Sequence, residues 1–418
     1  MSVRTTTLEN GLRVVTDEME SVESVSVGAW IDAGTRDESA DVNGISHLLE
    51  HMAFKGTERR DAQRIAEEIE AVGGHLNAYT AREHTAYYAK VLKEDLGLAV
   101  DILADILQHS VMDPVELERE QDVICQEINQ AFDTPDDCVF DYFQETAYPG
   151  QAIGRPVLGT ADRVRGLGPE ALLGYMRTHY SAPRIVIAAA GRLDHGRLAG
   201  LVEAAFVDLP APTDGAREPA RYVGGDFRED RDLEQVHVVV GMDGIAFEDP
   251  DFHAATVFST LAGGGMSSRL FQEVREKRGL AYSVYSYLSC YTDGGVFGVY
   301  AGSGRDQVAE LVPLIGDEIA KLADGAPTDE IDRARAQVKA GALMSLESTT
   351  ARSEQLARQM IVFGRPLPIE EIVRKVEAVD EAAIRRVAGR LIAGQPTLTA
   401  LGPVAGINGL DGLAAKRA

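Results

Sequence analysis

The sequence reads as two copies of one pattern, and this duplication limits the possible folds more than any other feature. An alternating segment at 21–38 is matched by one at 234–251, and a helical stretch follows each. Both halves then continue with a strand pair, a long amphipathic helix, a second helix with a start signal and a closing apolar strand. Most matching elements are offset by about 213 residues and the strand pairs by about 205, so a short insertion or deletion separates the copies there.

Within each copy, strands and helices mix without regular β-α-β alternation. This predicts two tandem, similar α+β domains, each a mainly antiparallel sheet with helices packed on it. The length of 418 residues suits two domains. The segment 209–225, rich in Pro, Gly and Ala, lies between the copies. We therefore predict a domain at 1–210, a linker at 211–227 and a second domain at 228–418.

Charge and cysteine content narrow the function classes. The net charge of −25 comes from 66 acidic and 41 basic residues. Such a surface repels nucleic acid and anionic membranes, although the acidity could serve solubility alone. The three cysteines show no CxxC spacing, which argues against a disulfide framework or a cysteine zinc site. The first 20 residues lack an apolar signal region and no stretch of about 20 apolar residues occurs, so we expect a cytoplasmic protein without membrane spans.

The stretch HLLEH at 47–51 carries the strongest chemical signal. His47 and His51 are four residues apart, so a helix places both imidazoles on one face, with Glu50 beside them. Two neutral imidazoles can bind zinc, and a neighbouring carboxylate can take a proton from a zinc-activated water. HxxEH is the inverzincin pattern. It supplies two ligands and a base, and it lacks a third ligand.

An acid on another element would complete the ligand set. The helix predicted from Asp113 offers four glutamates, Glu116, Glu118, Glu120 and Glu127. Glu120 and Glu127 are seven residues apart and share a face. Periodicity alone does not choose among the four.

The segments HLLEHMAFKGT, HLNAYTAREHTAYYAKVL and EREQDVICQEINQ together resemble the M16 (pitrilysin-type) zinc peptidases, and most closely the M16B subfamily of the processing-peptidase type. The resemblance extends over nearly the whole chain. It implies that His47, His51 and Glu127 hold one Zn²⁺ per chain, that Glu50 is the catalytic base, and that Glu120 supports the site from behind. Glu127 stands 76 residues after His51, as in the family pattern.

The second copy lacks these ligands, since STLAGGG at 259–265 stands where HLLEH stands in the first. By the same resemblance, Arg275 and Tyr282 are the family's substrate-binding Arg–Tyr pair, and Phe271 matches an aromatic residue before them. Arg278 is the nearest competitor for the arginine. A guanidinium suits a carbonyl or carboxylate, and a phenol suits a developing oxyanion.

The resemblance also implies a substrate-binding strand. Asn77, Ala78 and Tyr79 match the edge strand that pairs with an extended substrate, although the segment can also be an ordinary sheet strand. Phe54 matches a pocket aromatic, or else belongs to the core. Asp137 and Asp141 match acids that bind a substrate arginine, or form an acidic loop.

We therefore expect a zinc metalloendopeptidase that acts on peptides or unfolded polypeptides, with a preference for sites near basic residues. In the family, two such halves enclose a chamber, and this chain corresponds to one half, so we expect a homodimer. The alternatives are a non-catalytic core-type assembly subunit and one subunit of a hetero-oligomeric peptidase. The intact HxxEH motif argues against both.

Overall fold

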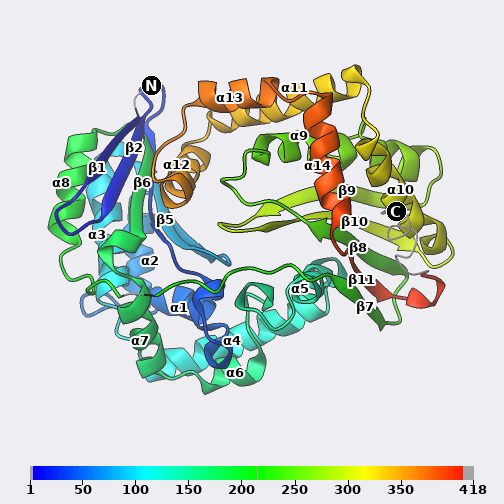
Figure 1. Cartoon of the computed structure of the whole chain (residues 1–418). Helices are drawn as coiled ribbons and strands as arrows, with labels where there is room; N and C mark the ends of the chain where they lie inside the picture. The colour runs from blue at the N-terminus through cyan, green and yellow to red at the C-terminus, as the bar shows by residue number, and fades with distance from the viewer. Residues whose placement is uncertain (1–2, 214, 408–418) are drawn as a thin grey trace. The chain divides into compact units, whose positions relative to one another are not determined.

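The structure is a computed structural model, and it describes residues 3–213 and 215–407. The described chain packs into two compact units (Figure 1). The first unit comprises the residues up to Gln130, Arg155–Glu218 and Met344–Leu367. The second comprises Ala131–Gly154, Pro219–Leu343 and the described residues from Pro368 onward.

The first unit is built on a six-stranded sheet in the order β1-β2-β6-β3-β5-β4. Its strands are β1 (Val3–Thr7), β2 (Arg13–Glu18), β6 (Ile185–Gly191), β3 (Ser24–Ile31), β5 (Thr85–Leu92) and β4 (His75–Thr80). Only the β2–β6 pair is parallel, and every other neighbouring pair is antiparallel. Strand β4 is therefore an edge strand, with β5 as its neighbour.

Both faces of this sheet are apolar. On β3, Val25, Val27 and Ala29 point to one face, where they share a core with the helices named next. Those helices are α1 (Ile45–Ala53), α2 (Ala62–Ala71), α3 (Leu96–Gln108), α4 (Pro114–Phe132), α6 (Ala161–Gly166), α7 (Pro169–His179) and α8 (His195–Ala205). Trp30 points to the opposite face, which α12 (Thr349–Phe363) covers. Burial on both faces explains the continuous apolar run IVIAAAG of β6.

The second unit repeats this plan with a five-stranded sheet in the order β7-β11-β8-β10-β9. Its strands are β7 (Gly225–Asp230), β11 (Thr397–Gly402), β8 (Gln235–Asp243), β10 (Gly295–Gly304) and β9 (Ala281–Cys290), and only β7–β11 is parallel. The helices are α9 (Phe252–Gly263), α10 (Val308–Ala323), α11 (Thr328–Ser345), α13 (Ile369–Glu377), α14 (Glu381–Ala393) and a π-helical turn at Phe271–Glu276. Helix α5 (Pro135–Ala147) covers the sheet face opposite α9, α10 and α14.

The two units exchange one helix each. Helix α5 lies in the first copy of the sequence but packs on β11, β8 and β7 of the second unit. Helix α12 lies in the second copy but packs on β6, β3 and β2 of the first unit. The predicted α+β class, with two similar, mainly antiparallel sheets, is confirmed. The predicted domains at 1–210 and 228–418 stay a prediction. The two packing units are each made of several separate segments and cannot be compared with them directly.

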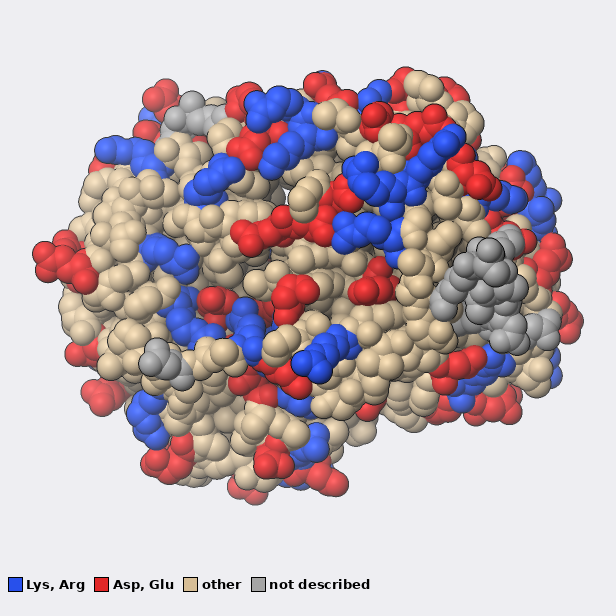
Figure 2. Space-filling view, in the orientation of Figure 1, with Lys and Arg blue, Asp and Glu red and all other residues tan. Residues whose placement is uncertain are grey.

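Two further observations bear on the predicted surface and membrane properties. No helix among residues 3–213 and 215–407 is long and apolar enough to cross a membrane. Figure 2 shows acidic and basic side chains interspersed on the face it draws. On that face the acidic side chains do not form one continuous negative patch.

Candidate metal centre

Helix α1 carries the two histidines on a buried scaffold. It begins after Gly44, whose φ of 99° favours glycine and whose Cβ would lie 2.9 Å from the carbonyl oxygen of Leu158. Leu48, Leu49 and Met52 are at most 1% exposed, so the apolar face of the helix is fixed in the core. His47 and His51 point away from that core, with ring centroids 4.7 Å apart.

Helix α4 supplies the acid that meets both histidines. Glu127 Oε2 lies 3.7 Å from Nε2 of His47 and 3.7 Å from Nε2 of His51. One ligand atom from each of the three residues lies within 4.8 Å of the others. Of the competing acids, Glu118 is exposed and Glu116 pairs with Arg119, which leaves Glu127 facing the imidazoles.

Glu120 lies behind His51 and fixes its ring. Its Oε2 is 2.8 Å from His51 Nδ1, and its Oε1 is 2.7 Å from Lys55 Nζ. The side chain is buried, which raises its pKa, but the hydrogen bonds with His51 and Lys55 outweigh burial and the net pKa is lowered. A carboxylate on Nδ1 leaves Nε2 of His51 available as a ligand. Lys55, which the sequence reasoning missed, completes this arrangement.

The donor set fits a zinc ion. Burial lowers the pKa of His47 to about 4, so this imidazole is neutral and ready to coordinate. Burial also lowers the pKa of His51, but the hydrogen bond with Glu120 and the charges of Glu127 and Glu50 outweigh it. Two imidazoles and one carboxylate are a usual catalytic zinc set with one position left open. Among the described residues, no other group of three His, Cys, Asp or Glu side chains converges in this way.

Glu50 lies beside the ligands and is held by the edge strand. Thr80 Oγ1, on β4, donates a 2.6 Å hydrogen bond to Glu50 Oε2. Burial raises the pKa of Glu50, and the charge of Glu127 adds to this rise. A carboxyl group with a raised pKa is suited to accept and return a proton. Sequence reasoning did not find Thr80, because only the pairing of β4 with the sheet brings it to α1.

The predicted substrate strand is β4, and its residues face two ways. Asn77 is exposed, and its Oδ1 accepts a hydrogen bond from the N–H of Ala78 (2.8 Å). Tyr79, two residues further on, lies on the same face as Asn77, and its hydroxyl is 3.1 Å from His84 Nε2 and 3.4 Å from Glu354 Oε1 on α12. Ala78 lies on the opposite face, against the core that includes α1. Phe54 is half-buried against the core, with its ring 6.2 Å from that of Tyr87. The edge of β4 thus runs past Thr80 and Glu50.

The other predicted substrate residues lie in the second unit. The guanidinium carbon of Arg275 lies 4.8 Å from the ring centre of Phe271 and 4.3 Å from that of Tyr282. Arg275 also donates a 3.0 Å hydrogen bond to the carbonyl of Tyr282, a residue that is 75% exposed. The competitor Arg278 pairs with Glu273 instead. The structure therefore brings Arg275, Phe271 and Tyr282 together.

Asp137 and Asp141, the two acids predicted to bind a substrate arginine, both lie on α5. Asp137 is exposed and Asp141 is half-buried. Their helix belongs to the second unit because of the helix exchange.

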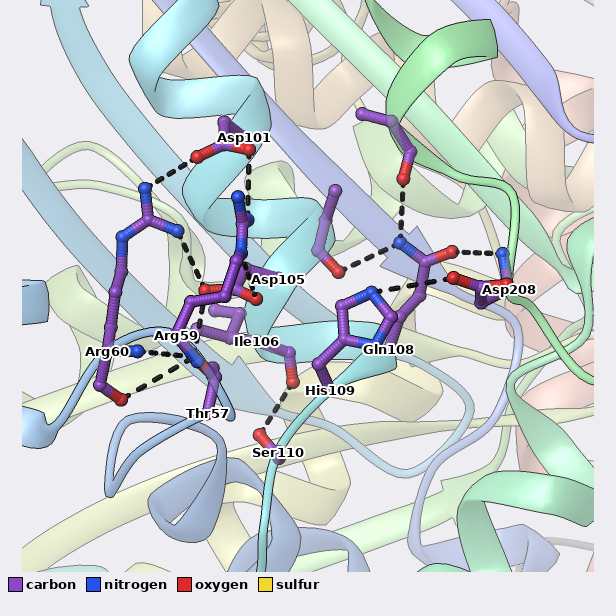
Figure 3. Close-up of polar contacts among 12 residues, drawn as sticks. Thr57, Arg59, Arg60, Asp101, Asp105, Ile106, Gln108, His109, Ser110 and Asp208 are labelled. Atoms are coloured by element: carbon purple, nitrogen blue, oxygen red, sulfur yellow. Dashed lines mark hydrogen bonds and ion pairs between the residues drawn. The ribbon is translucent and has the colours of Figure 1, made fainter.

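A second polar cluster anchors the chain that follows α1 (Figure 3). Asp105 on α3 is fully buried and accepts hydrogen bonds from Thr57 Oγ1 (2.8 Å), Arg60 (2.7 Å) and Arg59 (3.0 Å). Asp101 pairs with both arginines. A neighbouring cavity of about 330 Å³ is lined by Arg59, Asp101 and Asp105 of this cluster and by Gln108 and His109. Because these charges satisfy one another, we read the cluster as structural.

Comparisons with known proteins agree with the geometry. The family profile described as "Insulinase (Peptidase family M16)" matches residues 13–161, and the one described as "Peptidase M16 inactive domain" matches residues 166–338. The chain is 41% identical over 413 residues to an uncharacterized zinc protease of Streptomyces coelicolor, covering 96% of this chain and 90% of the relative. It is 38% identical over 413 residues to the mitochondrial-processing peptidase subunit beta of Rattus norvegicus, covering 96% and 84%.

Solved structures show the same fold. A protease from Helicobacter pylori matches with a TM-score of 0.88 at 22% identity, covering 96% of this chain and 99% of that one. A chain of complex III2 from Candida albicans matches with a TM-score of 0.87 at 22% identity, covering 99% of each. At these identities the likeness concerns the fold alone. The two profile matches and the relatives identical at 38–41% over 96% of the chain place this protein in peptidase family M16.

Proposed function

We propose that this chain is a zinc metalloendopeptidase that hydrolyses peptides or unfolded polypeptides. The observation that carries the proposal is the convergence of His47, His51 and Glu127 beside Glu50. The uncharacterized zinc protease of Streptomyces coelicolor and the processing peptidase of Rattus norvegicus add support by similarity. The intact ligand set gives no reason to favour a non-catalytic assembly subunit.

Zinc held by the three ligands would supply Lewis acidity, which brings the pKa of a water molecule toward about 7. Glu50 accepts the proton of the attacking water and returns it to the leaving amine. The hydrogen bond from Thr80 holds the Glu50 carboxylate in place for both transfers. Glu120 and Lys55 keep Nδ1 of His51 engaged, so that its Nε2 stays directed to the centre.

Strand β4 is the proposed binding edge for substrate. An extended peptide can add to an edge strand through main-chain hydrogen bonds, which recognise backbone more than side chains. The N–H of Ala78 donates a hydrogen bond to the side chain of Asn77. The Asn77 side chain would therefore have to turn away before a substrate strand could pair at this position. A peptide paired along β4 would pass Thr80 and so reach Glu50.

The residues of the second unit are proposed to act on the same substrate. Arg275 and Tyr282 would bind the peptide backbone, with Tyr282 as a donor to the developing oxyanion. Phe271 stacks on Arg275 and limits its motion. Asp137 and Asp141 would favour substrates with a nearby arginine or lysine. We further propose a homodimer that encloses a chamber and excludes folded proteins.

The central test replaces Glu50 by Gln. We expect cleavage of a peptide library to be lost while zinc is still bound, and Glu67→Gln on the exposed face of α2 to leave cleavage unchanged. Persistent cleavage by the zinc-loaded Glu50→Gln enzyme would sink the proposal. Mass spectrometry of the wild-type products gives the side-chain preference.

The assembly has its own test. Light scattering measures the oligomeric state, and a fully active monomer would contradict the homodimer. Mixing His47→Ala chains with Arg275→Ala chains then decides how the site is completed. Recovery of activity on mixing indicates that Arg275 acts on the partner's centre.

A further inference from the structure

A buried carboxylate that is not part of the ligand set lies at the start of α1. Glu38 is only 4% exposed. Its Oε1 accepts a hydrogen bond from the N–H of Ser46 (2.9 Å), and its Oε2 accepts one from the N–H of Gly44 (2.9 Å). Asn43 Nδ2 donates a third hydrogen bond to the carboxylate, at Oε2 (2.9 Å). The same Nδ2 also donates to the carbonyl oxygen of Pro156 (3.1 Å).

These contacts replace a helix cap that the sequence does not provide locally. The residue before α1 is Gly44, which has no side chain to accept from the first-turn N–H groups. Glu38 supplies that acceptor from outside the helix. The hydroxyl of Ser46 is also fixed, because it donates to the hydroxyl of Tyr175 (2.9 Å). The backbone immediately before His47 is thus held from two sides.

The negative charge of an ionised Glu38 would also favour a cation bound near the start of α1. The N-terminus of a helix carries roughly half a positive charge, which disfavours a dication bound one turn away. All three partners of Glu38 are N–H donors, which favours the ionised carboxylate. Burial raises the pKa of Glu38 and outweighs the opposing hydrogen bonds from Asn43, Ser46 and Gly44, so its net pKa is raised. In its ionised form Glu38 offsets the positive helix end beside the metal centre.

We propose that Glu38 is a positioning residue for the metal centre, acting through the first turn of α1 on His47. The inference rests on the zinc site of the proposed function. Glu38 touches neither the ligands nor the substrate strand in the contacts described above. Its effect therefore concerns how tightly the centre holds metal, and it leaves the recognition of the peptide unchanged.

The test measures zinc affinity of the purified full chain by competition with a chromophoric chelator. In Glu38→Gln the shape is kept, but the amide presents an N–H to at least one of the three donors. We expect zinc binding about tenfold weaker, the low end for loss of a group that orients a metal ligand. The KM for a peptide measured at saturating zinc should stay unchanged.

The matched control is Glu318→Gln, which removes another buried carboxylate. Glu318 is 5% exposed, lies on α10 of the second unit and pairs with Lys321. We expect this variant to bind zinc as the wild type does. Zinc binding of Glu38→Gln equal to wild type, with or without a lower melting temperature, would overturn the inference and leave Glu38 a purely structural residue.

Two further measurements keep the result interpretable. If Glu38→Gln does not fold, Glu38→Asp keeps the charge and shortens the reach, and its zinc affinity should fall by about threefold; an unchanged affinity again overturns the inference. Loss of zinc binding in His47→Ala tests the metal site itself. Failure of the proposed function would appear there, and failure of the present inference only in the Glu38 variants.

Discussion

The exchange of α5 and α12 predicts that a substitution late in the chain will loosen a sheet made from its first half. Leu356 on α12 is 7% exposed and belongs to one apolar cluster with Val15, Trp30 and Val186. Leu356→Ala removes nearly the full apolar contact of this side chain and leaves a gap over the sheet. Such a change costs about 2–5 kcal/mol, and we expect about 3 kcal/mol here, near a hundredfold in an opening equilibrium.

Hydrogen exchange followed by mass spectrometry locates the effect along the chain. We expect amides of β3 and β6, in residues 24–31 and 185–191, to lose about two orders of magnitude in protection. Leu343→Ala is the control, because Leu343 is 42% exposed on α11 and its loss should change stability by less than about 0.5 kcal/mol. If protection falls only within 228–343 and stays intact in β3 and β6, α12 does not cover the first sheet and the exchange is refuted.

Three further predictions concern the centre and the pH range of stability. Glu120→Gln should weaken zinc binding by about 10–100-fold, because a neutral amide cannot replace the carboxylate that accepts from both His51 and Lys55. Glu116→Gln on the same helix should leave the zinc affinity unchanged. Equal zinc affinities of the two variants would contradict this role of Glu120. Tyr282→Phe should lower kcat by about tenfold or more at unchanged zinc affinity, as peptide kinetics would show, and an unchanged kcat would remove its oxyanion role. Burial lowers the pKa of His84 and His179 from 6.5 to about 4 in the folded state, so the unfolded chain binds more protons between these values. The free energy of unfolding should therefore fall as pH drops from 6.5 toward 4, by on the order of 3 kcal/mol for the buried His84 and by less for the partly exposed His179. Urea titrations measure this change, and a flat profile in that window would be inconsistent with it.

Much of the candidate centre follows from local sequence. The spacing of His47 and His51 with Glu50 between them needs only helical geometry, because residues four apart share a face. The predicted helix α4 offered four glutamates as candidates for the third ligand. Only the family resemblance selected Glu127 from them. The structure adds the physical reason, since Glu127 faces both imidazoles at 3.7 Å.

The supporting residues were not visible in the sequence. Lys55 has no pattern that sets it apart from a surface lysine, yet it pairs with Glu120 at 2.7 Å. Thr80 reaches Glu50 only because β4 lies at the sheet edge next to α1. Glu38 ends the alternating segment 21–38, and no pattern in the sequence connects it with α1. Each of these contacts joins elements whose relative placement depends on tertiary packing.

The sequence by itself determined the α+β class and the order of the strands and helices that the two copies share, but it did not reveal β1, β2 and β7. These features depend on hydrophobic periodicity, which is local. Only the tertiary structure decided that α5 and α12 change places between the halves. An amphipathic helix specifies that one face is buried, but not which sheet buries it. Because both sheets offer an apolar face of the same kind, the choice between them rests on the packing of the whole chain.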